Sequence, residues 1–295
     1  MKQKLTDLYA KNGTKKVLAS LLSILAGLLL GSIVVIIVGL AEQKITTAGM
    51  WEGVRLIFAG ILSTGRDAAG ALTWGFNAQN VGNMLFRAMP LIMTGLSVGF
   101  AFKTGLFNIG AAGQYTLGAY GALYCAIMLK LPWFVCLLVA AVLGGLWGAI
   151  PGFFKAYFNI NEVITSIMFN WIGLYLVNEL VYQNGTGPMY DVRNTRTLNL
   201  GKNADLAQSV IPDFGLNKLF QTNSTTIAIF LAAAVAVLIW VVLNKTTFGY
   251  ELKAVGLNKN AARYAGINEK KNIILSMAIA GALAGFGAGL YFLSN

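Results

Sequence analysis

The amino-acid sequence predicts an all-α integral membrane protein, a polytopic helical bundle, and three observations support this prediction. Hydrophobic residues make up 57% of the 295 residues and charged residues only 11%, whereas soluble domains carry roughly 25% charged residues. The hydrophobic residues form long unbroken runs, and a membrane barrel would instead show short alternating segments. The Lys and Arg residues behind the net charge of +11 flank these runs, which is typical of membrane topology and not of a nucleic-acid-binding patch.

Apolar runs of membrane-spanning length define the expected elements, since a spanning helix needs about 20 mostly apolar residues. A shorter stretch, 50–62, carries Trp51 and Arg55 and suits an interfacial or partly inserted helix better than a full span. We therefore expect a cytoplasmic basic tail at 1–16 and a polytopic transmembrane domain at 17–295. The seven predicted spans are 17–40, 82–102, 111–129, 132–154, 162–181, 225–243 and 273–293.

The distribution of Lys and Arg predicts which side of the membrane each long loop faces. With a cytoplasmic N-terminus, the basic tail, Lys103, Lys155 and the loop 244–272 lie inside, and the inner side then carries more Lys and Arg than the outer side. The loop 182–224, which is rich in Asn, Thr and Gly, faces outward in this arrangement. The sequence stops at Asn295, directly after a predicted span, which leads us to expect a C-terminally truncated fragment or an unusually short chain.

The residue types present exclude several kinds of site. The sequence contains no His, which excludes histidine-dependent catalysis, haem ligation by His and most zinc sites. Cys125 and Cys136 both lie in apolar runs and are expected to be small buried hydrophobic residues. No paired carboxylates converge, so we predict no catalytic residue, no metal and no cofactor in this chain.

The stretch "GLFNIGAAGQYTLGAY", from Gly105 to Tyr120, places glycines and amides at the edge of a membrane span. Non-helical backbone at membrane depth is tolerated only where it is buried in protein or lines a cavity. Two interpretations remain open for Asn108 and Gln114. They are capping groups of a tight helix–turn–helix, or they belong to a broken segment beside a polar route through the bundle.

A second polar pattern opens the fifth predicted span, in "NEVITSIMFN" (161–170). Glu162, Ser166 and Asn170 are spaced by four residues and therefore share one face of a helix. Glu162 suits a carboxylate at a helix N-terminus or a group on the polar route. Asn170 lies near mid-membrane, where a polar side chain usually faces the bundle interior, either in an interhelical hydrogen bond or as a pore-lining contact.

Glycines repeat every four residues in three of the predicted spans, as Gly95-xxx-Gly99, Gly144-xxx-Gly148-xxx-Gly152 and Gly281-xxx-Gly285-xxx-Gly289. This spacing puts them on one helical face and lets a neighbouring backbone approach closely. Such faces serve general helix packing, or they let helices slide and rock against one another. The sequence alone does not separate these two interpretations.

Within the loop 244–272, "NKNAARYAGI" predicts a short helix that Asn258 or Asn260 caps and Gly266 ends. Ala261 and Ala265 fall on one face of this helix, and we expect this face of small residues to fit into a groove of a partner protein. The alternative is a solvated basic loop near anionic lipid. The predicted contact residues are Asn258, Ala261, Ala262, Arg263, Tyr264, Ala265 and Gly266.

Three segments in order carry a resemblance to a known family: "PLIMTGLSVGFAFKTGLFNIGAAGQYTLGAY" (90–120), "NEVITSIMFNWI" (161–172) and "YELKAVGLNKNAARYAGINEKKNIILSMAIAGALAGFGAGL" (250–290). From about residue 80 onward the chain resembles inner-membrane permease subunits of ABC importers, of the branched-chain amino acid and ribose type. The nucleoside and simple-sugar permeases are the most similar branch. Ala112 departs from the family pattern, in which an acidic residue is expected at this place.

The resemblance implies a type II ABC importer permease in the cytoplasmic membrane of a bacterium, as one of two permease subunits in a homo- or heterodimer. It also implies a cytoplasmic ATPase that binds the ATP and an extracytoplasmic substrate-binding lipoprotein as partners. Segments around Asn108, Gln114, Glu162, Ser166 and Asn170 would surround the translocation path, and the helix in the loop 244–272 would contact the ATPase.

The leading functional hypothesis is therefore a permease subunit without an ATP site of its own, and the sequence indeed lacks a Walker-type loop. Amides and hydroxyls suit a neutral, hydrogen-bonding solute. The resemblance makes nucleosides the first choice of solute, and simple sugars of the ribose or galactose type the second. An ion-coupled secondary transporter is a weaker alternative, since no acidic residue lies at mid-membrane. A membrane enzyme is the weakest alternative.

Overall fold

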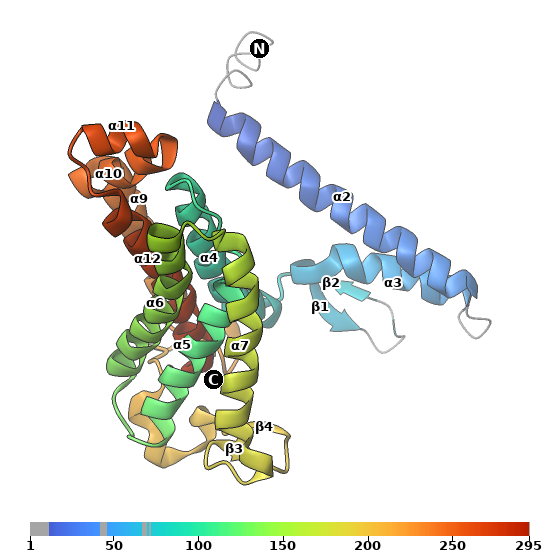
Figure 1. Cartoon of the computed structure of the whole chain (residues 1–295). Coiled ribbons are helices and arrows are strands. Elements are labelled where there is room, and N and C mark those ends of the chain that lie inside the picture. Colours follow the sequence, from blue (N-terminus) through green and yellow to red (C-terminus); the bar gives the residue numbers. More distant parts are fainter. Residues whose placement is uncertain (1–11, 42–45, 67–69, 71, 295) are drawn as a thin grey trace. The chain divides into compact units, whose positions relative to one another are not determined.

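A computed structural model describes residues 12–41, 46–66, 70 and 72–294 of the chain (Figure 1). Residues 1–11 of the predicted basic tail (1–16) therefore lie outside the described residues, and residues 12–16 form the start of a helix. The structure divides into two units, Met1–Asn80 and Val81–Asn295, and each is described by itself.

The first unit contains the long helix α2 (Asn12–Ala41), the shorter helix α3 (Thr47–Ala59) and a small hairpin of β1 (Ser63–Arg66) and β2 (Leu72–Trp74). α2 contains the predicted span 17–40, and its apolar side chains are mostly exposed, as expected for a surface that meets lipid. α3 forms over most of the stretch predicted as interfacial. Its 13 residues extend only about 20 Å, which is less than the hydrocarbon core of a bilayer.

The second unit is a bundle of helices, and each of the six spans predicted after residue 80 forms a helix at the expected place. Six helices of the described residues, α2 included, are long and apolar enough to cross a membrane. The run predicted at 111–129 forms a seventh helix, α5, whose 17 residues are at the short end of the spanning range. The helices of the bundle are α4 (Ala78–Lys103), α5 (Ala111–Ile127), α6 (Trp133–Phe158), α7 (Glu162–Tyr182), α9 (Ala228–Lys245) and α12 (Glu269–Phe292).

α12 lies at the centre of this unit and packs against α5 and α6. The glycine faces explain how the backbones come so close: a Cβ on Gly144 would lie 2.5 Å from the Gly281 carbonyl oxygen, and one on Gly148 would lie 2.5 Å from that of Met277. No side chain larger than hydrogen fits at such distances. The repeated glycines of α6 and α12 therefore form the contact between these two helices, as the packing interpretation predicts. The repeat in α4 does not fit that interpretation, because a Cβ on Gly95 or Gly99 would meet no described atom within 4 Å.

The predicted loop 182–224 is a folded cap, residues 183–224, built of short 3-10 turns, the hairpin of β3 (Tyr190–Asp191) and β4 (Arg196–Thr197), and the short helix α8 (Leu216–Phe220). Ser209 Oγ donates to the Leu131 carbonyl oxygen at 2.6 Å, and the Ile211 backbone N–H donates to that of Leu293 at 2.8 Å. These bonds hold the cap against the ends of α5, α6 and α12. Its buried apolar anchors are Met189, Leu200, Leu206 and Ile211.

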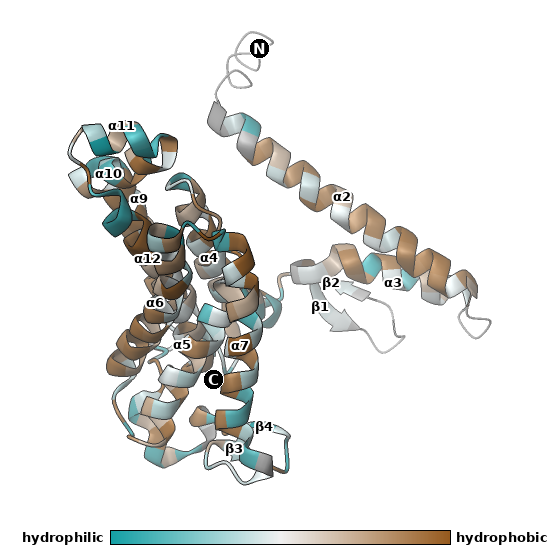
Figure 2. Cartoon of the chain, in the orientation of Figure 1, coloured by the Kyte–Doolittle hydropathy of each residue, from teal (hydrophilic) through white to brown (hydrophobic). Residues whose placement is uncertain are grey.

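The other long loop forms two helices, α10 (Thr247–Leu257) and α11 (Lys259–Tyr264), at the opposite end of the bundle from β3 and β4 (Figure 1). Figure 2 shows hydrophilic residues gathered around α10 and α11 and hydrophobic residues along α6 and α9. This banding is what a bundle embedded in a bilayer requires.

Candidate functional site

Asn108 and Gln114 form a reciprocal amide pair in the connection between α4 and α5. Asn108 Nδ2 donates to Gln114 Oε1 at 2.8 Å, and Gln114 Nε2 donates to Asn108 Oδ1 at 2.9 Å. Asn108 Nδ2 also donates to Ser97 Oγ at 3.0 Å, and Ser97 Oγ donates to the Ala280 carbonyl oxygen at 2.6 Å. Ser97, Asn108 and Gln114 are each at most 1% exposed. The network ties α4, α5 and α12 together, and it satisfies the amides without solvent.

Glycines provide the space for this amide pair. Gly105 turns the chain after α4 with a φ of +74°, a conformation that glycine adopts without steric cost. A Cβ on Gly110 would lie 3.0 Å from Gln114 Nε2, and one on Gly148 of α6 would lie 3.2 Å from the same atom. The glycine-rich stretch is thus a tight helix–turn–helix around a buried polar pair. A direct contact of Asn108 or Gln114 with a solute stays a prediction.

Asn170 of α7 bridges to the start of α5. Its Oδ1 accepts the Gly113 backbone N–H at 2.7 Å, and its Nδ2 donates to the Ile109 carbonyl oxygen at 2.8 Å. The first N–H groups of a helix have no partner within the helix, so Asn170 satisfies one of them from a neighbouring helix. The interhelical hydrogen bond anticipated for Asn170 is therefore present.

Asn170 also lies at the edge of a shallow cavity of about 270 Å³ between α5 and α7, which we call the α5–α7 groove. Its lining contains amide, hydroxyl, aromatic and aliphatic side chains and no charged one. One helical turn before Asn170, Ser166 Oγ is buried and has no hydrogen-bond partner among the described residues. The groove is lined by Ala112, Thr116, Ile167, Asn170, Trp171 and Leu174.

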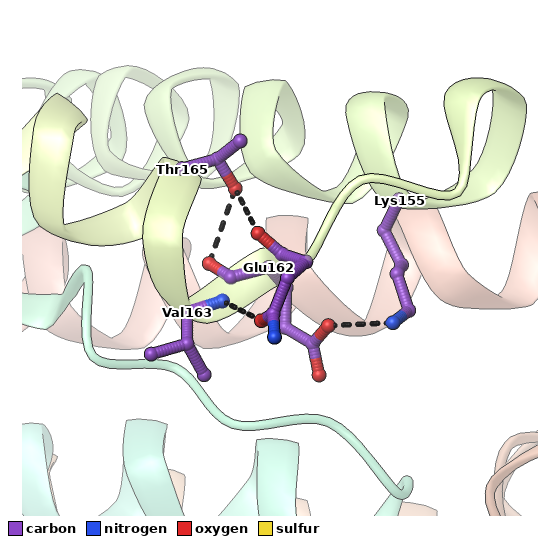
Figure 3. A network of polar contacts seen from close by, with 5 residues as sticks. Lys155, Glu162, Val163 and Thr165 are labelled. Carbon is purple, nitrogen blue, oxygen red and sulfur yellow. Dashed lines mark hydrogen bonds and ion pairs between the residues drawn. The ribbon is translucent and has the colours of Figure 1, made fainter.

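Glu162 takes part in a separate network at the start of α7 (Figure 3). Its Oε2 lies 2.8 Å from Lys155 Nζ near the end of α6, so the ion pair joins the two helices across their tight turn. Asn161 Oδ1 caps α7 by accepting the Val163 backbone N–H at 2.9 Å. Glu162 also lies in the first turn of the helix, where the dipole favours a carboxylate. Within the described residues it makes no contact with the amide pair.

The helix predicted at "NKNAARYAGI" forms as α11, and Asn258 is its cap. Asn258 Oδ1 accepts the Ala261 backbone N–H at 3.1 Å, and Gly266 follows the helix with a φ of +80°. Ala262 is buried against the rest of the chain, whereas Ala261, Arg263, Ala265 and Tyr264 are exposed. Of the predicted contact residues, Ala262 therefore faces inward and supports the helix.

Two large side chains stand exposed among the polar residues of the tip formed by α10 and α11. Leu257 is 89% exposed and Tyr264 is 94% exposed. Within this tip, Gly256 of α10 abuts the α4–α5 connection: a Cβ on Gly256 would lie 2.5 Å from the Thr104 carbonyl carbon. The exposed tip is thus in direct backbone contact with the segment that carries Asn108.

Several residues of these networks were not anticipated from the sequence. Ser97 connects the amide pair to α12, Lys155 pairs with Glu162, and Trp147 Nε1 donates to the Phe169 carbonyl oxygen at 3.1 Å. Ser97 and Trp147 each bond a backbone carbonyl of another helix, for which the sequence offers no signal. The pairing of Lys155 with Glu162 could have been predicted from the sequence, because only one tight turn separates the end of α6 from the start of α7.

Comparisons with known proteins agree with this architecture. Residues 80–295 match the family described as "Branched-chain amino acid transport system / permease component". The guanosine ABC transporter permease protein NupP of Bacillus subtilis is 33% identical over 283 residues, which cover 92% of this chain and 71% of NupP. The nucleoside ABC transporter permease protein NupB of Lactococcus lactis is 33% identical over 288 residues, or 95% of this chain and 71% of NupB.

A third relative is named for a sugar. The glucose ABC transporter permease protein TsgB13 of Haloferax volcanii is 35% identical over 211 residues, which cover 69% of this chain and 54% of TsgB13. No solved structure matches the chain. The family match over most of the sequence, the permeases among its relatives and the bundle of apolar helices lead to one conclusion: the chain is a multi-pass membrane protein that belongs to the permease-component family of the branched-chain amino acid transport systems.

Proposed function

We propose that the chain is the permease subunit of an ATP-driven importer for nucleosides. The observation that carries the proposal is the extent of the similarity to NupP and NupB, two permeases named for guanosine and nucleosides, over 92% and 95% of this chain. The similarity to the glucose permease TsgB13 covers 69% of the chain. A simple-sugar importer is therefore the second candidate.

The α5–α7 groove supports a neutral solute on the translocation path. It offers the Asn170 amide, the Thr116 hydroxyl and the Trp171 ring, and no charged side chain lines it. A charged solute entering such a surface would lose its hydration without an opposite charge to replace it. The unpaired hydroxyl of Ser166 lies one turn away and is free to bond a solute or a water once the helices move.

The exposed tip of α10 and α11 supports a docking role for a cytoplasmic ATPase that supplies the ATP hydrolysis. Leu257 and Tyr264 expose apolar surface that a partner would cover, and Arg263 is placed to pair with an acidic residue at the rim. Gly256 contacts the α4–α5 connection directly, so a movement of the tip would be transmitted to the bundle through this contact. In this arrangement the N-terminus and the tip face the cytoplasm, and the cap faces the substrate-binding protein.

Uptake measurements test the proposed solute. The chain is expressed with its partner ATPase, second permease and binding protein in a host that lacks nucleoside import, and uptake of labelled guanosine, uridine, ribose and glucose is compared. We expect ATP-dependent uptake of the nucleosides at least tenfold above the vector control, and ribose and glucose at the background level. Uptake of a sugar without uptake of either nucleoside would replace the proposal with its second candidate.

A further inference from the structure

A small cavity lies between the cap and the last turn of α12, apart from the α5–α7 groove and the amide pair. Its volume is about 220 Å³, and its lining comes from α5, from β4 with the residues that follow it, and from the end of α12. The cavity is partly open to the surface, so a small solute can enter it.

The floor of this cavity is aromatic and held in place. Tyr291 and Phe292 line it, and the Tyr291 ring stacks on Phe86 of α4 with centroids 4.7 Å apart. Phe292 meets Tyr291 edge to face at 5.3 Å and contacts Tyr115 of α5 at 6.4 Å. Rings from three helices thus form a rigid apolar surface against which a flat ring can pack.

The roof of the cavity is polar and has unused hydrogen-bonding capacity. Thr197 and Asn199 line it and are half-buried, and their side chains make no hydrogen bond to the described part of the chain. The Asn199 amide offers both a donor and an acceptor, and the Thr197 hydroxyl offers the same. Partly desolvated polar groups of this kind favour a ligand that supplies matching partners.

One charged side chain, Arg196, also lines the cavity. In the β3–β4 hairpin Arg196 pairs across the strands with Asp191. The Asn194 side chain, further backbone N–H groups and the Arg196 charge hold the pKa of Asp191 below its ordinary value. Asp191 is therefore ionised at neutral pH and places a negative charge across the hairpin from Arg196.

From this combination we infer that the cavity between β4 and the end of α12 is a receiving site for the nucleoside, with the base on the Tyr291–Phe292 floor and its polar edges toward Thr197 and Asn199. The inference rests on the proposed function and adds a place where the solute first meets the permease. The site lies at the end of the bundle that carries the cap, where the substrate-binding protein would release the nucleoside. A sugar lacks the flat ring that the floor accommodates.

Photolabelling tests the site directly. Membranes that contain the full chain are irradiated with 8-azidoguanosine, and the labelled peptides are identified by mass spectrometry. We expect the label on peptides with residues 196–199 or 291–292, removed by excess guanosine and unaffected by excess ribose. Label confined to other parts of the chain, or label that excess guanosine does not displace, would overturn the inference.

A matched pair of variants separates recognition from folding. Asn199→Leu should lower the labelling at least fivefold, whereas Asn203→Leu, the same change at an exposed cap position outside the cavity, should leave it unchanged. If Asn199→Leu fails to accumulate in the membrane, Thr197→Val provides a nearly isosteric replacement with the same expectation. Normal labelling in the variants, together with guanosine uptake by the wild type, would overturn the receiving site and leave the proposed function standing. Absence of nucleoside uptake by the wild type would overturn the proposed function itself.

Discussion

At the scale of single residues, the polar side chains of this protein serve first to join helices. Asn108, Gln114 and Ser97 satisfy one another and a carbonyl of α12, and Asn170 satisfies two backbone groups beside α5. In a membrane, polar groups that found no such partner would be costly. Three of the residues that the sequence marks as candidates for the translocation path, Asn108, Gln114 and Asn170, thus also fix α5 against its neighbours.

Replacing Asn170 tests how closely these two roles are connected. Asn170→Leu removes both hydrogen bonds to the α5 start, at a cost of about 0.6–2 kcal/mol each in a membrane protein. We expect a lower melting temperature of the detergent-solubilised protein and at least a tenfold loss of nucleoside uptake, with the protein still present in the membrane. Asn178→Leu, at an exposed position of the same helix, is the control. Uptake and melting temperature equal to the wild type would show that the Asn170 bridge matters for neither.

The sequence predicts part of this site, and the rest depends on contacts between distant residues. Hydropathy is sufficient to place the helices, because lipid demands long apolar runs, and the amide-rich turn at Asn108 is visible as an exception to such runs. The partner of Ser97 is a backbone carbonyl 183 residues away. Every residue presents such a carbonyl, so the sequence contains no signal for this bond.

At the scale of elements, local residue preferences predict where the helices begin and end, but they do not predict which side chains of a helix are buried. The cap of α11 at Asn258 and its end at Gly266 follow from residue preferences alone. That Ala262 is buried while Ala261 is exposed follows from how α11 lies on the bundle. The cap of residues 183–224 is polar in composition, and its few apolar residues do not form a pattern that predicts a fold. The structure shows that Met189, Leu200 and Leu206 among them are the buried anchors.

The exposed tip of α10 and α11 makes a prediction about the ATPase. Ala261→Glu adds bulk and a charge to the outward face of α11, next to the exposed Tyr264, and leaves the buried Ala262 untouched. We expect normal membrane insertion, loss of solute-stimulated ATP hydrolysis and weaker co-purification of the ATPase. Ala204→Glu, at an exposed position of the cap at the other end of the bundle, controls for the added charge. Stimulated hydrolysis at the wild-type rate in Ala261→Glu would remove α11 from the coupling role.

At the scale of the whole molecule, the two ends of the helical bundle differ in their secondary structure and in their charge. One end carries the cap, which is held down by hydrogen bonds and buried anchors, and the other carries α10 and α11 with Lys253, Lys259 and Arg263 (Figure 2). Positive residues in short loops favour the cytoplasmic side. The difference between the ends therefore predicts the orientation of the chain in the membrane.

Cysteine accessibility measures this orientation. In a background with Cys125→Ala and Cys136→Ala, single cysteines are placed at two exposed positions, Asn203 of the cap and Asn260 of α11. An impermeant charged maleimide should label Asn203→Cys in intact cells, because the proposed topology puts the cap outside. It should label Asn260→Cys only after the cells are permeabilised, because the tip must face the cytoplasm to meet an ATPase. The two native cysteines are buried, at 6% and 0% exposed, so the background itself should give no signal. The reverse labelling pattern would invert the topology, and would contradict both the ATPase contact at α11 and the receiving site beneath the cap.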